Sequence, residues 1–157
     1  MRLLRFFEDF TIAPSRLNPS KIDLEWRERD SDAYFNAYSL SDGTLRFICL
    51  ATLLQQPADL MPSTIVIDEP ELGLHPYAIS LLASMLRSAA TQTQVVVSTQ
   101  SVPLVNQFIP EDLIIVERKG RESVFRRLEA SEVELWVDEY GLGDLWEKNV
   151  IGGRPRR

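Results

Sequence analysis

The spacing of apolar residues divides the chain into short strands and amphipathic helices. Around Trp26, apolar and charged residues alternate, and this period of two predicts a half-buried strand. Two continuous apolar runs, TIVID and TQVVVST, are typical of buried strands inside a parallel sheet. The expected strands are residues 3–12, 21–28, 64–68, 93–99, 112–118 and 122–128, the last two joined as a hairpin. Residues 29–38 are polar, and we expect them to be irregular.

Apolar residues at helical spacing predict two longer helices, one from Ser41 to near Pro57 and one beginning at Pro76. The buried stripe expected on the first helix consists of Leu45, Ile48, Cys49, Leu53 and Leu54. The buried face expected on the second consists of Ile79, Leu82, Ala83 and Leu86. Ser131 and Glu134 form a capping-box pattern that opens a helix through Trp136, and residues 141–149 predict a short final helix.

This order of elements predicts an α/β fold with a mostly parallel sheet flanked by helices, followed by a C-terminal strand pair and helices. We expect one domain over residues 1–150 and a flexible tail over residues 151–157. Ligands of such sheets bind at the carboxyl ends of the strands. Asp68 and Glu69 lie at one such end, and Thr99, Gln100 and Ser101 lie at another. Adjacent parallel strands would bring these two groups together.

Composition narrows the functional classes. The net charge of -6 disfavours a nucleic-acid ligand, so DNA is expected only as an indirect partner. One histidine and one cysteine argue against a zinc site, and Cys49 predicts a buried thiol in a reducing compartment. No apolar run has the length of a membrane span. We therefore expect a cytoplasmic protein without a membrane partner.

Two adjacent carboxylates, Asp68 and Glu69, end the TIVID run. A carboxylate at the end of a buried strand can orient hydrated Mg²⁺, and a second one beside it can polarise a water for attack on a phosphoryl group. The other interpretation is that the pair only starts the turn at Pro70. By itself the pattern leaves both open.

Upstream, Ser41, Asp42, Gly43 and Thr44 stand at the start of the first long helix. The free N–H groups and dipole of a helix N-terminus attract phosphate, and Gly43 would let it approach the backbone closely. An ordinary N-cap explains the same residues, and for this stretch alone it is the simpler interpretation.

Taken together, these stretches resemble a known family. LSDGT (40–44) resembles the signature motif of ABC-type ATPases related to RecF and SMC proteins. TIVIDE (64–69) and the D-loop that follows (72–76) are similar to their Walker B strand and D-loop, and residues 97–101 to their switch. The resemblance spans residues 40–106 and implies a partial P-loop NTPase fold. The segment YGLGDLWEKNVIGGRP is also similar to a group of AAA-type bacterial ATPases of this superfamily.

The resemblance implies a role for each matching residue. Asp68 would hold Mg²⁺ through water, and Glu69 would be the catalytic carboxylate. Ser41, Asp42 and Gly43 would contact ATP bound to a second subunit, and His75 would lie in the D-loop at the dimer interface. Gln100 occupies the switch position, which is often histidine in the family; it can donate a hydrogen bond but cannot carry a proton.

The chain departs from the family in one larger respect. None of its seven glycines belongs to a G-x-x-x-x-G-K-[ST] phosphate loop. We therefore expect the C-terminal half of an ATPase head, which binds ATP weakly or not at all by itself and is inactive alone. Its partner would be a missing N-terminal half or a complete head, and the complete form would be a homodimer.

Two functions remain open at this point. The complete protein would hydrolyse ATP with Mg²⁺ between two heads, in DNA repair, chromosome maintenance or phage defence. Alternatively, the chain is a non-catalytic half-head that regulates a complete ATPase by supplying its signature motif.

Overall fold

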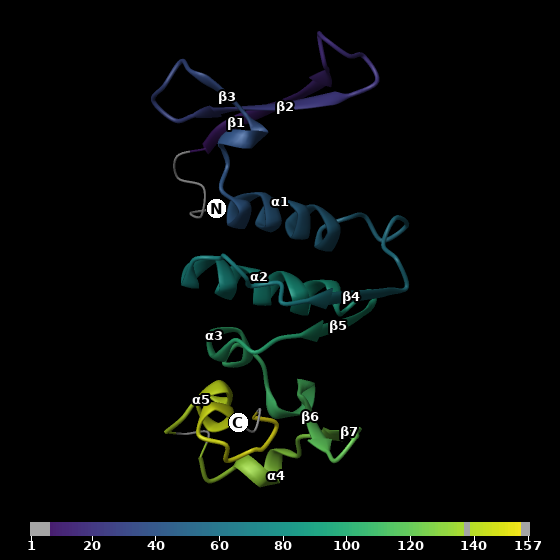
Figure 1. The fold of residues 1–157 in the computed structure, drawn as a ribbon, viewed down its shortest axis with the longest axis vertical. Coiled ribbons are helices and arrows are strands. Elements are labelled where there is room, and N and C mark those ends of the chain that lie inside the picture. Colours follow the sequence, from purple (N-terminus) through teal and green to yellow (C-terminus); the bar gives the residue numbers. More distant parts are fainter. Residues whose placement is uncertain (1–6, 137–138, 155–157) are drawn as a thin grey trace.

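The computed structural model describes residues 7–136 and 139–154, and its elements follow one another along the long axis of the molecule (Figure 1). An antiparallel sheet lies at one end, two long helices and a parallel strand pair lie in the middle, and a small group of strands and helices lies at the other end. The expected α/β class is confirmed. No helix within the described ranges has the length and apolar character needed to cross a bilayer.

The N-terminal sheet contains β1 (Phe7–Pro14), β2 (Ile22–Glu28) and β3 (Tyr34–Asn36), paired antiparallel in that order. The alternation around Trp26 correctly predicted β2. The expectation that residues 29–38 are irregular was wrong, because they contain β3 and a 3-10 turn, η1 (Ala37–Ser39). Contacts with β2 that its own pattern does not reveal stabilise this strand: the ring of Phe35 stacks on Trp26, with 4.9 Å between centroids, and the Trp26 indole N–H donates to the Asn36 carbonyl at 3.1 Å.

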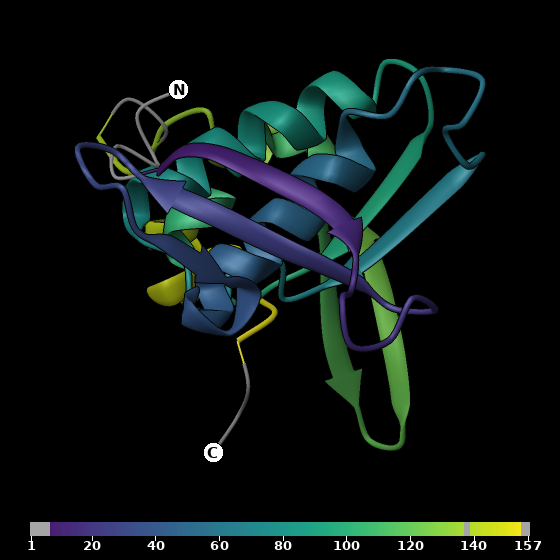
Figure 2. The same cartoon turned by 90° about the horizontal axis from the view of Figure 1, so that it is seen from above.

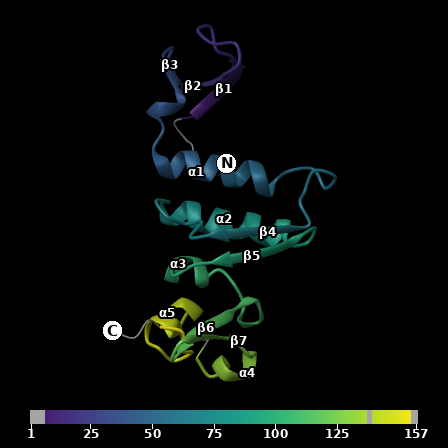
Figure 3. The same cartoon turned by 45° about the vertical axis from the view of Figure 1, so that its right-hand side comes forward.

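The centre of the molecule is a β-α-β unit. Here β4 (Thr64–Asp68) pairs in parallel with β5 (Gln94–Ser98), and α2 (Pro76–Ala89) connects them. The helix α1 (Asp42–Leu54) packs against α2, and these four elements enclose the main core. Figure 3 shows the parallel pair lying along α2. The buried face predicted for α2 is confirmed, since Ile79, Leu82, Ala83 and Leu86 are all buried.

The buried stripe predicted for α1 was only partly right. The buried residues of this helix are Gly43, Phe47, Leu50 and Leu54, so only the last of the five expected positions is buried. Cys49 is exposed, contrary to the expectation of a buried thiol. The helix is apolar on more than one side, and helical spacing alone cannot decide which apolar stripe faces α2.

The parallel strands are covered on one face only. Ile65, Ile67, Val95 and Val97 point toward the helices and join the core. On the opposite face, Val66 and Val96 are opposite each other in the register and are 74% and 45% exposed. Both strands had been expected to be fully buried, as strands of parallel sheets normally are, because a layer packs on each face. Within the described residues, the second layer is missing here.

The C-terminal part forms its own small core. It contains α3 (Val102–Val105), η2 (Pro110–Asp112), β6 (Ile114–Lys119), β7 (Glu122–Arg127), α4 (Ala130–Val133) and α5 (Leu142–Glu147). The hairpin β6–β7 forms as predicted and extends away from the helices (Figure 2).

The helix expected to have Ser131 as its N-cap and to continue through Trp136 instead has Glu129 as its N-cap and ends at Val133. The predicted cap was wrong, because Glu132 accepts from the N–H of Glu129 at 2.9 Å and shifts the box two residues toward the N-terminus. Of the expected tail 151–157, Ile151 is buried and the N–H of Gly153 donates to Glu117 at 3.2 Å. Residues 155–157 lie outside the described ranges.

Candidate functional site

The carboxyl ends of β4 and β5 bring Asp68 and Ser98 together. The two residues are partners in the parallel register, and the Ser98 hydroxyl donates a hydrogen bond to the Asp68 carboxylate. Side chains alternate along a strand, so both lie on the same uncovered face as Val66 and Val96. Asp68 is therefore an exposed carboxylate at the edge where the sheet lacks a covering layer.

Glu69 turns away from the strand in an unusual conformation. Its φ of 44° lies in the left-handed region, which non-glycine residues rarely adopt and which often marks a functional site. The turn is fixed by its own N–H, which donates to the Ser98 carbonyl at 2.9 Å. Its carboxylate accepts a hydrogen bond from the backbone N–H of Gln100. The structure thus brings Glu69 and Gln100 side by side.

The environment of Glu69 favours the protonated form. Partial burial is the largest cause that raises the pKa of its carboxyl group above the ordinary value. The hydrogen bond to the Glu71 side chain, the charge of Glu71 and the charge of Asp68 raise the pKa further, while the Gln100 N–H lowers it. Three carboxylates therefore crowd one turn.

One member of this site, Glu71, was missed in the sequence, and Thr99 was expected there only by its place at a strand end. Glu71 is 7% exposed, and its Oε1 accepts from the Thr99 hydroxyl at 2.5 Å. The signal for Glu71 was present as a third acid two residues after the carboxylate pair. The signal for Thr99 was its place at the end of the neighbouring strand. Thr99 falls within the switch segment 97–101, but the resemblance gives no role to its side chain or to Glu71, so only the fold reveals their contact.

Ser41 acts as the N-cap of α1, as its position predicted. Its hydroxyl accepts from the N–H of Thr44 at 3.2 Å and lies 2.9 Å from the Thr44 hydroxyl. Asp42 is the first residue of the helix, and both Ser41 and Asp42 are exposed. The local geometry is that of an ordinary cap, and the exposed helix N-terminus remains available to an anion.

Gly43 is buried for a structural reason. A Cβ on this residue would lie 2.1 Å from the carbonyl oxygen of Gly73, so no larger residue fits without a backbone shift. Gly73 itself has a φ of 79° and makes the turn within residues 72–76. Segments 40–44 and 72–76 are therefore in direct backbone contact.

His75 is exposed and caps α2, with its Nδ1 accepting from the N–H of Tyr77 at 3.3 Å. Helix α1 is linked to the carboxylate turn by Arg46, whose guanidinium donates to the Glu69 carbonyl at 3.0 Å. The predicted residues consequently form two neighbouring groups: Asp68, Glu69 and Gln100 at the strand ends, and Ser41, Asp42, Gly43 and His75 at the helix N-termini.

The site could bind a magnesium ion only if waters and phosphate oxygens supply most of its ligands. No group of three or more histidine, cysteine, aspartate or glutamate side chains in the described ranges is placed to hold a metal. A single exposed carboxylate with a neighbouring hydroxyl, as at Asp68, suits Mg²⁺, because this ion keeps several waters and takes further ligands from phosphate. The glycines 141 and 143 do not form a phosphate cradle, since both pack against Asn106.

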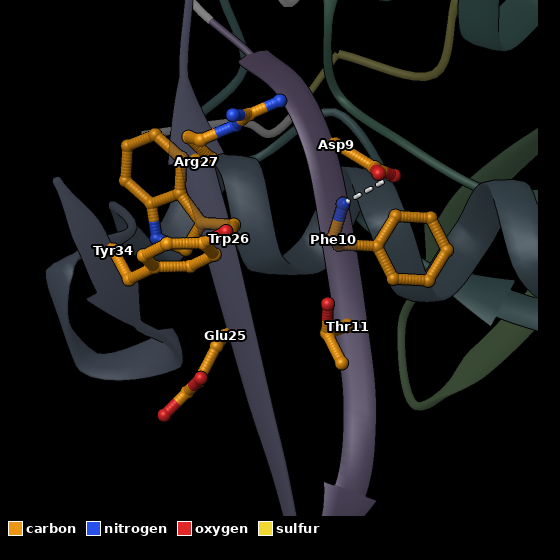
Figure 4. Close-up of a pocket in the computed structure, with 7 residues that line it drawn as sticks. All are labelled: Asp9, Phe10, Thr11, Glu25, Trp26, Arg27 and Tyr34. Carbon is orange, nitrogen blue, oxygen red and sulfur yellow. Dashed lines mark hydrogen bonds between the residues drawn. The ribbon is translucent and has the colours of Figure 1, made fainter. Parts of the chain in front are cut away.

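A separate hollow lies on the polar face of the N-terminal sheet. Figure 4 shows Asp9, Glu25, Arg27 and Tyr34 around it, from all three strands. None of the predicted site residues lines it. The hollow therefore belongs to the surface of the β1–β3 sheet and not to the carboxylate site.

Comparison with known proteins supports an ATPase fold. A solved structure described as "Structural biochemistry of ATP-driven dimerization and DNA stimulated activation of SMC ATPases" matches with a TM-score of 0.61 and 14% sequence identity. The match covers 86% of this chain and 83% of the solved chain, so the two are similar in size and share the fold. No curated protein matches significantly.

A family model matches residues 3–106, which include the start of α1, the carboxylate turn and residues 97–101. The match covers well over half of the chain. The chain belongs to the family described as "AAA domain, putative AbiEii toxin, Type IV TA system".

Proposed function

We propose that this chain is the part of an ATPase head that carries the signature, the Walker B carboxylates, the D-loop and the switch, and that a phosphate-loop segment completes its ATP site. One observation carries the proposal: Asp68, Glu69 and Gln100 meet at the carboxyl edge of a parallel strand pair whose adjoining face is apolar and uncovered. Parallel sheets bind nucleotides at this edge, and they are normally covered on both faces.

The surface of the chain supports a large partner. A compact protein of 17.9 kDa exposes about 8,000 Å², whereas this chain exposes 11412 Å². Apolar residues are exposed on the central sheet and also on β1 and β2, where Phe10, Ile12 and Ile22 are each more than half exposed. Apolar area of this extent is typical of a surface that another polypeptide covers. We propose that the phosphate-loop segment packs on the Val66–Val96 face, beside Asp68.

Each residue has a role in the proposed site. Asp68 would hold Mg²⁺ through a water, and the ion supplies positive charge that stabilises the phosphate oxygens. Glu69 would accept a hydrogen bond from the attacking water and orient it toward the γ-phosphate. Gln100 would donate an amide hydrogen bond to that water or to the phosphate, without transferring a proton.

The helix N-termini would act on a second head. Ser41, Asp42 and Gly43 would contact the γ-phosphate of ATP bound to the partner head, with the exposed N–H groups of α1 as donors. His75, which is exposed at the start of α2, would lie at the interface between the heads. The solved SMC structure is described as showing ATP-driven dimerization, and we propose a homodimer of the complete form.

A second candidate function rests on the sequence and the same surfaces. The chain has no phosphate loop, yet Ser41 and Asp42 are exposed and Ser41 caps α1. A half-head of this kind could bind a complete ATPase and present its signature to that enzyme without hydrolysing ATP itself. The description of the family includes a toxin of a type IV toxin–antitoxin system. Phage defence, DNA repair and chromosome maintenance are the proposed settings.

The decisive experiment combines this chain with a phosphate-loop chain from the same genome. We expect calorimetry to show no binding of Mg²⁺·ATP by the isolated chain, and the mixture to form a complex that hydrolyses ATP. The variant Glu69→Gln should form the same complex and lose hydrolysis. A complex that never hydrolyses ATP would favour the regulatory half-head. If no complex forms, or if the isolated chain binds ATP at micromolar concentration, the proposal is wrong.

A further inference from the structure

Glu71 is a buried carboxylate that the proposed mechanism does not use. It is 7% exposed, and its Oε2 is buried without a hydrogen-bond donor among the described residues. Burial of a carboxylate oxygen without a donor costs free energy, because the oxygen loses its water. A residue retained at such a cost in the middle of a site calls for a role other than stability.

The contacts of Glu71 extend in two directions. Its side chain accepts from the Thr99 hydroxyl at 2.5 Å, and the Thr99 oxygen accepts in turn from the N–H of Ser101 at 3.0 Å. These hydrogen bonds hold Thr99 and Ser101, the two residues that flank Gln100 in the sequence. Ser101 then caps α3, since its hydroxyl accepts from the N–H of Leu104 at 3.3 Å. One buried carboxylate thus fixes the whole switch loop.

The backbone of Glu71 holds the D-loop. Its carbonyl accepts from the N–H of Leu74 at 2.9 Å, which closes the turn through Gly73 just before His75. The side chain of Glu71 also contacts the Glu69 carboxyl group. A single residue therefore touches the D-loop through its main chain, and the switch loop and the catalytic carboxylate through its side chain.

We propose that Glu71 is a positioning residue that couples the D-loop to the switch loop, through Thr99 and Ser101. The inference rests on the proposed function, in which the D-loop lies at the interface between heads. A change in the D-loop on association with a partner would be transmitted to Gln100 and Glu69 along these hydrogen bonds. Neither the signature nor the Walker B pattern assigns a role to Glu71 or Thr99.

Amide hydrogen exchange of the isolated chain, measured by NMR, tests the coupling without nucleotide. The variant Glu71→Ala removes the acceptor of the Thr99 hydroxyl, and Thr99→Val removes the hydroxyl itself. We expect each to accelerate exchange of the Ser101 N–H about fivefold or more, as the loss of one hydrogen bond predicts. The core amide of Leu82 should keep its rate. The double variant should equal Thr99→Val alone, because both changes break the same chain of bonds.

Two further variants separate positioning from general destabilisation. Glu71→Gln keeps an acceptor for Thr99 and should restore slow exchange at Ser101. Thr52→Val is the matched control, because the Thr52 hydroxyl donates to a backbone carbonyl on α1 at 2.8 Å, away from the switch, and Ser101 should not respond to it. The inference is overturned if Glu71→Ala leaves the Ser101 rate unchanged, or if Glu71→Gln exchanges as fast as Glu71→Ala. If Glu71→Ala does not fold, the exchange rates of the Ser101 N–H in Thr99→Val and Glu71→Gln test the inference instead. Unchanged exchange in Thr99→Val would then overturn it.

A second measurement links the coupling to the reaction. In a complex with a phosphate-loop chain, Glu71→Ala should lower kcat for ATP about tenfold and leave KM unchanged, because positioning and not binding is lost. Glu71→Gln should recover most of kcat. An unchanged kcat overturns the proposed coupling. A complex that is inactive with the unaltered chain counts against the proposed function only, since the exchange result at Ser101 is obtained without it.

Discussion

The two faces of the β4–β5 sheet carry the same kind of side chain and have opposite surroundings. Ile65 on the inner face is 4% exposed against α1 and α2, whereas its neighbour Val66 on the outer face is 74% exposed. The inner face holds the folded chain together. The outer face ends in Asp68 and has no covering layer among the described residues. The comparison teaches that burial of one face of a strand does not determine burial of the other, and we propose that a partner covers the outer face.

The largest expected effect on stability comes from a substitution on the inner face of the sheet. Ile65→Ala should lower the free energy of unfolding by about 2–4 kcal/mol, because it removes buried methyl groups and leaves a cavity in the core. The matched change Val66→Ala should alter it by less than about 0.5 kcal/mol in the isolated chain. Urea unfolding of both variants measures the difference. Equal losses would show that the outer face is also covered in the isolated chain.

The next largest effect comes from a substitution on the outer face of the sheet. Val66→Asp should leave urea unfolding of the isolated chain nearly unchanged and weaken the complex with a phosphate-loop chain at least tenfold, because an aspartate would be buried without a partner. Titration by calorimetry measures the affinity. Val150→Asp is the control, since Val150 is 47% exposed but lies beyond α5. Equal losses from both variants would contradict the proposed location of the interface.

The smallest expected effect comes from Glu69, at the edge of the sheet where β4 ends. The pKa of Glu69 is raised above 4.5, so the native state binds a proton more tightly than the unfolded chain does. The free energy of unfolding therefore falls as the pH rises from the pKa of Glu69 in the unfolded chain through its higher pKa in the native state. Glu69→Gln cannot titrate, and we expect it to raise Tm by about 1–3 °C at neutral pH and to give no gain well below pH 4.5.

Thermal unfolding as a function of pH checks this sign. Glu122→Gln, at an exposed glutamate on β7, is the control for removing one negative charge elsewhere. A gain for Glu69→Gln that stays constant down to low pH would show that crowding with Glu71 and Asp68 does not cause it.

Local patterns sufficed where contacts are local or where a motif specifies the turn. The cap at Ser41, the start of α2 at Pro76 and its buried face, and the β6–β7 hairpin were all predicted correctly. The meeting of Asp68, Glu69 and Gln100 followed from two parallel strands ending at the same edge. In each case neighbouring residues, or the direction of a strand, already determine the contact.

The failures share a physical cause. The buried stripe of α1, the exposure of Cys49 and the short strand β3 all depend on which element packs against which. An apolar residue in the sequence shows only that burial would be favourable, not that a partner is present to provide it. For the same reason, the apolar run of β4 could not show that one face stays open.

The sequence by itself determined most of the strands and helices, the order of the motifs and the carboxylate pair at a strand end, because these depend on neighbours along the chain. Only the tertiary structure decided that Gly43 touches Gly73, that Glu71 holds Thr99, and that Val66 and Val96 remain uncovered. These contacts join residues about 30 positions apart, and their geometry depends on how the elements pack, which no local pattern encodes.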